Sequence, residues 1–410
     1  MTGGAPGDDA VAELLARLDR YPAERYPVQH ATTRFHLGVA LAGRGRLDDA
    51  EDALLVACRL FQPDQLPVEH AKAANALGAV QRMTGRFDGA AASFTAAAGR
   101  FRDAGLPLEE GAALYNLGLA ERERGGEAVA AFERARALLD PAKVPEQAAA
   151  AARELGAALL AADRPDDAVP LLEDAVELAT RADDRPGLGG AANALGLAHL
   201  AAGRPDAAVR ALEQAVAANP RRVRPDAYAM AKANLALALE ASGRVARARL
   251  AALQALGSPS VPPPVGAQAA AIVARVGAEP GAVWAVLDED DQERWAAVVR
   301  EEVTRWEAAP ESARRAECAA WVAGQLERPG RAEDLAEAFL SALIELPPAA
   351  LDLMVHSTVA ALWDHDGGAQ KQFAGQCSRA LARFAVPQLL RLKDAFSAAA
   401  TEAGLAATSW

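Results

Sequence analysis

Aromatic and β-branched residues are scarce in this chain. Aromatic side chains make up 5% of the 410 residues, although hydrophobic residues make up 51%. The apolar fraction consists mainly of Ala and Leu, which favour helices over strands. We therefore expect an all-α fold with almost no sheet.

Basic charge and long apolar runs are also lacking. The 43 Lys and Arg residues are outnumbered by 55 Asp and Glu residues, which gives a net charge of −12. This balance argues against general affinity for nucleic acid or anionic lipid, because both need concentrated positive charge. No apolar run reaches the ~20 residues that a membrane span needs. The start, Met1 to Asp9, lacks the basic and apolar parts of a secretory signal, so we expect a cytoplasmic protein.

Cysteine is rare, and recognisable catalytic motifs are missing. Cys58, Cys318 and Cys377 stand far apart, so the sequence contains neither a paired zinc knuckle nor a CxxC redox motif. We expect reduced, half-buried thiols. No GxSxG, HExxH or P-loop sequence occurs. We predict no metal, no cofactor and no enzymatic activity, and an enzyme site in the C-terminal region is the least favoured alternative.

Three further polar or aromatic clusters are candidate sites. His356 and His365 stand half a turn out of alignment on one helix at ~100° per residue, so they should not share a metal. The acidic run 288–291 resembles a calcium loop only in its charge and suits a helix start. Trp295 and Trp306 share one helix face, which indicates core packing, with an aromatic docking surface as the alternative.

The dominant feature that is present is an internal repeat. The pair Leu37-Gly38 recurs at positions 77, 117, 155 and 195, and as Leu235-Ala236, in steps of about 40 residues. A turn follows each pair, usually Gly-Arg. A small, a large and a small residue then follow at i, i+4 and i+7, as in Ala90, Phe94 and Ala97, which places them on one helix face. Gly or Ala allows two antiparallel helices to approach closely. The third repeat is two residues short at its turn, which predicts a local kink.

This pattern resembles the tetratricopeptide repeat, whose consensus has Leu-Gly in the first helix and Ala, Phe and Ala in the second. The first consensus aromatic residue is missing, and its positions hold Arg34, Ala74, Leu114, Ala152, Ala192 and Lys232. The usual repeat has about 34 residues. This longer period resembles the repeats of kinesin light chains, polarity scaffolds and the sensor regions of bacterial regulators. HEAT and armadillo arrays have a similar period but not this order of residues. The resemblance implies a right-handed superhelical solenoid of helix hairpins.

The sequence divides into four regions. Residues 1–30 form an N-terminal capping region, in which Val11, Leu14, Leu15 and Leu18 lie on one side of an expected helix from Asp9 to Arg20. Residues 31–256 contain six repeats. Residues 257–266 form a Pro-rich linker, whose segment 257–264 is expected to be non-helical.

Residues 267–410 form a smaller C-terminal helical domain of about six helices with no recognised family. The composition changes at the linker, because every Trp follows it and every Tyr precedes it. These residues are Trp284, Trp295, Trp306, Trp321, Trp363 and Trp410, and Tyr21, Tyr26, Tyr115 and Tyr228.

The resemblance implies that the first helix of each hairpin lines a concave groove that binds a partner. By register, the candidate partner-binding residues are Lys72, Asn75, Arg82, Tyr115, Asn116, Arg122, Arg153, Asn193 and Asn234. An Asn side chain donates and accepts hydrogen bonds, so it suits an extended peptide backbone. The alternative is that these Asn residues bridge helices inside the array. The basic residues favour a ligand with carboxylates.

We therefore predict a protein- or peptide-binding scaffold or adaptor. Its C-terminal domain would serve homodimerisation or a second contact. The alternative is a ligand-sensing module of a bacterial regulator.

Overall fold

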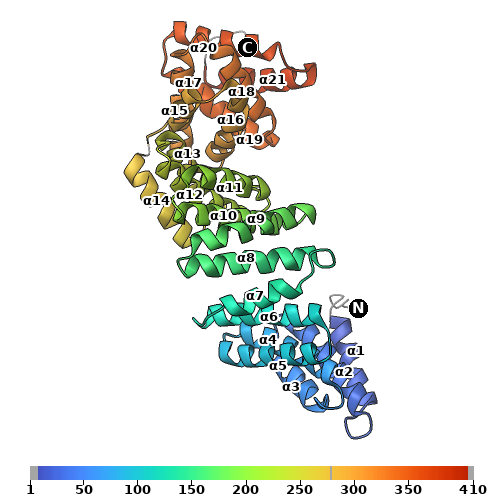
Figure 1. Ribbon diagram of the computed structural model, residues 1–410. Coiled ribbons are helices and arrows are strands. Elements are labelled where there is room, and N and C mark those ends of the chain that lie inside the picture. The colour runs from blue at the N-terminus through green and yellow to red at the C-terminus, as the bar shows by residue number, and fades with distance from the viewer. Residues whose placement is uncertain (1–7, 278, 405–410) are drawn as a thin grey trace. The chain divides into compact units, whose positions relative to one another are not determined.

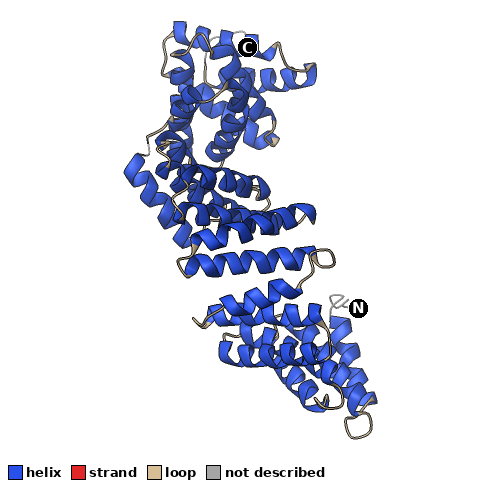
Figure 2. Cartoon of the chain, viewed as in Figure 1, coloured by secondary structure: helices blue, strands red, loops and turns tan. Residues whose placement is uncertain are grey.

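The structure is a computed structural model that describes residues 8–277 and 279–404. Within these residues it contains 21 α-helices and no strand, which confirms the expected all-α fold (Figures 1 and 2). The contacts divide the chain into two compact units, residues 1–202 and residues 203–410. Trp410 and residues 1–7 of the capping region lie outside the described residues.

The first unit begins with one helix and continues as helix hairpins. Its helices are α1 (Asp8–Arg20), α2 (Pro27–Ala42), α3 (Leu47–Leu60), α4 (Pro67–Met83), α5 (Phe87–Asp103), α6 (Pro107–Glu123), α7 (Val129–Leu138), α8 (Pro145–Ala161), α9 (Pro165–Arg181) and α10 (Arg185–Ala201). Pro opens α2, α4, α6 and α8, where its missing N–H costs no helical hydrogen bond. In α1, Val11 and Leu18 are buried as expected, whereas Leu15 is 49% exposed.

Glycine has two structural roles in the repeats. In the Leu-Gly pairs it lies where two helices pack closely, and in the turns it adopts a positive φ. A Cβ at Gly118 would lie 2.5 Å from Phe132, and one at Gly38 would lie 2.5 Å from Leu54, so an Ala side chain in either of these two hairpins would force its helices to shift. At the turn, Gly85 has a φ of 76°, a left-handed conformation that Gly adopts without strain. The short third repeat appears as a short α7 of 10 residues.

The first helices of neighbouring hairpins form a continuous layer. α4 packs on α6, α6 packs on α8, and α8 packs on α10. Side chains that point away from α5, α7 and α9 are therefore brought together on one face of this layer.

The second unit contains the rest of the repeats and the C-terminal helices. Its helices are α11 (Pro205–Ala218), α12 (Pro225–Ala241), α13 (Val245–Leu256), α14 (Pro263–Val276), α15 (Ala282–Glu289), α16 (Gln292–Glu307), α17 (Glu311–Leu326), α18 (Ala332–Ile344), α19 (Pro348–Trp363), α20 (Gly367–Leu381) and α21 (Val386–Glu402). The expectation that all of 257–264 is non-helical is wrong at its end. Pro263 and Pro264 form the first turn of α14, a position that tolerates Pro.

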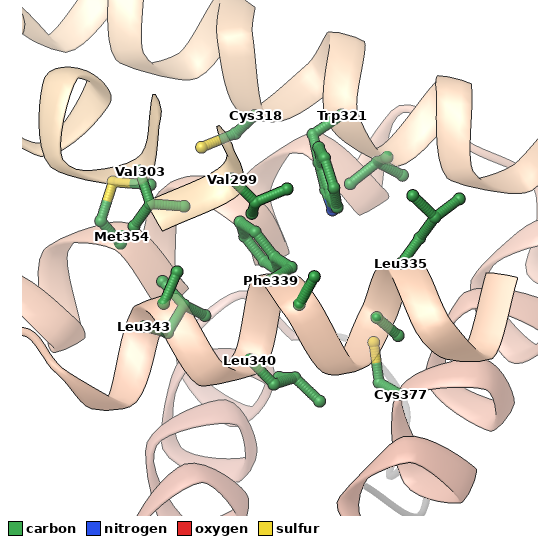
Figure 3. Packing of buried hydrophobic residues seen from close by; sticks show 14 of the residues in the cluster. Val299, Val303, Cys318, Trp321, Leu335, Phe339, Leu340, Leu343, Met354 and Cys377 are labelled. Atoms are coloured by element: carbon green, nitrogen blue, oxygen red, sulfur yellow. The ribbon is translucent and has the colours of Figure 1, made fainter. Parts of the chain in front are cut away.

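Aromatic side chains stack inside the largely aliphatic core of the C-terminal helices. Trp321 stacks on Trp284 at a ring-centroid distance of 4.6 Å and on Phe339 at 5.0 Å. Figure 3 shows Trp321 and Phe339 among the aliphatic side chains of this core. Trp295 and Trp306 are buried, which confirms core packing and rules out an exposed docking role for them.

Candidate functional site

Two asparagines from neighbouring hairpins meet on the layer of first helices. The Nδ2 atom of Asn116 in α6 donates a hydrogen bond to Oδ1 of Asn75 in α4 at 3.3 Å. Both side chains are partly exposed. Within the described part of the chain, Nδ2 of Asn75 and Oδ1 of Asn116 have no further hydrogen-bond partner. The pair therefore presents both N–H donors of Asn75 and the carbonyl acceptor of Asn116 to a ligand.

Ion pairs on the same helices also cross from one hairpin to the next. Nη1 of Arg82 in α4 lies 2.7 Å from Oε1 of Glu123 in α6. Arg122 in α6 pairs with Glu154 in α8, and Nη2 of Arg153 contacts the other oxygen of Glu154 at 2.8 Å. Three guanidinium groups thus share two carboxylates, which leaves an excess of positive charge.

Lys72 and Tyr115 complete this surface, which we call the first-helix face. Lys72 is exposed and forms no ion pair with any described residue. Tyr115 is partly buried, with its ring centroid 5.9 Å from that of Phe132. Burial, followed by the charge of Glu154, raises the pKa of Tyr115, so its hydroxyl remains protonated. The first-helix face consists of Lys72, Asn75, Arg82, Tyr115, Asn116, Arg122 and Arg153.

The two remaining candidates have different environments. Asn193 in α10 is partly exposed. Asn234 in α12 belongs to the second unit and is buried, and its Oδ1 accepts a hydrogen bond from Nε2 of Gln268 in α14 at 3.0 Å. Asn234 therefore bridges two helices, which is the alternative arrangement considered for these asparagines.

Two carboxylates that were not among the predicted site residues, Glu123 and Glu154, belong to this site. Glu123 and Glu154 neutralise much of the basic lining that the arginines were expected to provide. Each directly neighbours a candidate arginine in sequence, Arg122 and Arg153 respectively. This adjacency could have indicated that the two carboxylates lie near the arginines. It could not show that Arg82 and Arg122 would each pair with a carboxylate of the next hairpin.

The C-terminal clusters form ordinary surface contacts. Nε2 of His356 lies 2.9 Å from Oε2 of Glu402. Asp288 accepts a hydrogen bond from Nη2 of Arg328 at 2.6 Å, which lowers the pKa of this carboxyl. Among the described residues, no group of three or more His, Cys, Asp or Glu side chains could hold a metal ion.

The cysteine side chains are free thiols. Cys318 and Cys377 are buried, and burial raises the pKa of each to about 12. Because the thiolate is the nucleophile, these side chains are unreactive near neutral pH.

Within residues 8–277 and 279–404, no helix combines the length and the apolar character needed to cross a bilayer.

Comparison with protein families gives two matches, both described as tetratricopeptide repeat. One covers residues 147–221 and the other covers residues 7–64 and 193–262. A search of curated proteins gives no match.

Several solved structures are similar to this chain. TPR-like repeats of a putative kinesin light chain from Podosopora anserina are 23% identical with a TM-score of 0.38, and the match covers 50% of this chain and 94% of that one. BtubC from P. vanneervenii is 17% identical with a TM-score of 0.34 over 68% of this chain and 95% of that one. The apo quorum sensor NprR from B. thuringiensis is 12% identical with a TM-score of 0.44 over 85% and 97%.

Proposed function

This chain is a tetratricopeptide-repeat protein, and we propose that it is a scaffold that binds a protein or peptide through the first-helix face. The observation that carries this proposal is the Asn75–Asn116 pair, which keeps N–H donors and a carbonyl acceptor free on a partly exposed surface. An extended peptide backbone offers the complementary carbonyl and N–H groups. The proposed role is binding, and it requires no catalytic step.

The ion pairs favour a partner segment that contains a carboxylate. The Arg82–Glu123 pair is about one-third exposed, and pairs of this kind contribute only ~0–1 kcal/mol. A carboxylate of the partner could therefore replace Glu123 at little cost. Glu154, in contrast, is buried and holds Arg122 and Arg153 in place. We expect Arg82 to make the direct contact and Arg122 to supply supporting charge.

We also propose where the protein acts and that its C-terminal helices form a second binding surface. The three cysteines are free thiols, as is usual in the reducing cytoplasm, where we propose that the protein acts. A homodimer or second partner would use the C-terminal helices. Val386 and Leu390 in α21 are exposed apolar side chains that such a contact would cover.

A pair of double variants tests the binding face. Arg82→Ala with Arg122→Ala should weaken partner recovery from native lysate about tenfold or more, because charge-assisted contacts contribute ~1.5–3 kcal/mol each. Arg46→Ala with Arg164→Ala is the matched control, since both arginines form exposed ion pairs at turns. Melting curves should show that both double variants fold.

A third double variant tests the opposite assignment. His356→Ala with His365→Ala should leave partner recovery unchanged. Normal recovery with the Arg82/Arg122 variant, together with loss in the His356/His365 variant, would move the functional centre to the C-terminal helices.

A further inference from the structure

A cavity of about 420 Å³ lies within the second unit, which contains no residue of the first-helix face. The α11–α12 loop, the first turn of α12, α16 and the end of α18 enclose it. Val216 and Leu346 contribute apolar walls, while Arg221, Arg222 and Tyr228 contribute polar groups. We call this cavity the α11–α18 pocket.

Tyr228 is the unusual polar group of the pocket. The residue is only 4% exposed, yet its hydroxyl makes no hydrogen bond within the described residues. The hydroxyl oxygen is not completely buried, and Tyr228 lines the pocket, so a ligand in the pocket can reach this oxygen. Burial raises the pKa of Tyr228, which keeps the hydroxyl protonated and able to donate.

Two arginines of the pocket walls form no direct ion pair within the described residues, although Glu302 and Glu307 lie near Arg221. The carboxylate of Glu301 lies 2.6 Å from Nζ of Lys232, and that of Glu345 lies 2.8 Å from Nε of Arg300, so both acids are already paired. Arg221 donates through Nη2 to the carbonyl of Gly257, but its Nε has no partner. Arg222 is exposed and forms no ion pair with the described residues.

We propose that the α11–α18 pocket binds an organic carboxylate with an apolar body. Arg222 and the Tyr228 hydroxyl hold the carboxylate, and Arg221 adds positive charge beside it. The apolar body packs against Val216 and Leu346. Charge-assisted hydrogen bonds from guanidinium to carboxylate are short and directional.

The apolar walls of the pocket also favour an organic acid over inorganic phosphate. Phosphate has no apolar body to pack against Val216 and Leu346, so it should bind more weakly than the acid. A carboxylate of this kind belongs either to a small organic acid or to the C-terminus of a polypeptide. This proposal depends only on the second unit, so it stands or falls separately from peptide binding on the first-helix face.

Calorimetry with the full-length protein tests the ligand class. The probes are phenylacetate and a Gly-Gly-Phe peptide with a free C-terminus, each beside its amide. At least one acid should bind, and its amide should bind at least tenfold more weakly, a difference of about 1.4 kcal/mol. Tighter binding of the peptide acid would identify a chain terminus as the ligand, and tighter binding of phenylacetate would identify a small acid.

Single variants connect that binding to the pocket. Tyr228→Phe and Arg222→Gln should each weaken binding of the acid at least threefold. Arg210→Gln removes an exposed arginine of α11 that does not line the pocket, so it should leave binding unchanged. Because Arg222 is exposed, Arg222→Gln remains informative if Tyr228→Phe lowers stability.

Four results would overturn the proposal. The first is that neither acid binds at ~10 mM, well beyond the ~1 mM that corresponds to −4.1 kcal/mol. The second is that acids and amides bind equally, and the third is that inorganic phosphate binds more tightly than the acids. The fourth is that Arg222→Gln leaves the affinity for the acid unchanged.

Discussion

At Gly118 the two helices of a hairpin are so close that a single methyl group would collide with Phe132. Gly118→Ala should therefore lower the free energy of unfolding by ~1–3 kcal/mol, the usual cost of overpacking. Urea denaturation followed by circular dichroism measures this change. Gly99→Ala in α5 is the control, because its added Cβ would meet only the end of Arg102 at 3.9 Å.

The control should change stability in the opposite direction. Ala is favoured over Gly inside a helix by ~0.5–1 kcal/mol, so Gly99→Ala should raise the free energy of unfolding. A gain in stability of similar size in both variants would show that the close approach of the helices does not require Gly at position 118.

Two histidines should titrate on opposite sides of the ordinary pKa of about 6.5. Hydrogen bonding to the carbonyl of Asp352 and then to Glu402 raises the pKa of His356. Its stabilising contribution is therefore present below pH ~6.5 and is lost as the pH rises through the folded-state pKa. Burial, followed by the charge of Arg100, lowers the pKa of His70. Stability linked to His70 is present above pH ~6.5 and is lost as the pH falls through its lowered pKa.

Proton NMR titration of the two imidazoles measures both values directly. His70→Gln and His356→Gln assign the resonances. A reversed order, with His70 titrating above His356, would contradict the environments described for them.

At the scale of helices, α14 covers the end of the repeat array. It packs on α12 and α13, it buries Ala269 and Ile272, and it provides Gln268 to Asn234. Both a fragment of residues 1–257 and one of residues 1–276 should fold, because each repeat packs mainly on its neighbours. The longer fragment should melt at the higher temperature, since burial of Ile272 alone contributes ~1.5–3 kcal/mol.

Circular dichroism during a thermal melt compares the two fragments. Equal melting temperatures would show that α14 adds nothing to the array. Aggregation of both would show that the repeats need the C-terminal helices to fold.

The helices of the repeats were predictable because Leu-Gly pairs and turn residues recur with one period. The start of α14 was not, because consecutive prolines break the interior of a helix but are tolerated in its first turn, where Pro263 and Pro264 lie. The cationic residues of the first-helix face followed from the register of the repeats. Their pairing with Glu123 and Glu154 did not, because those pairs join different hairpins and depend on the packing of α4, α6 and α8.

At the scale of the whole molecule, composition and contacts divide the chain differently. The aromatic residues change type at residues 257–266, whereas the contacts separate residues 1–202 from residues 203–410. Leu250 of α13 belongs to the same core as Trp284 and Trp321, so the last repeat packs with the C-terminal helices. Composition indicates which residue types fill a core, but it does not indicate which helices pack together around that core. The proposed boundaries 1–30, 31–256, 257–266 and 267–410 remain predictions.

The most direct test of the scaffold proposal is site-specific photo-crosslinking in the native cell. A photoreactive amino acid replaces Lys72 on the first-helix face or, as the control, the exposed Glu173 of the second helix α9. The protein should form a discrete covalent adduct with a partner polypeptide from position 72 and none from position 173. Adduct formation from position 173 alone, or from neither position while the unmodified protein still recovers partners, would contradict binding through the first-helix face.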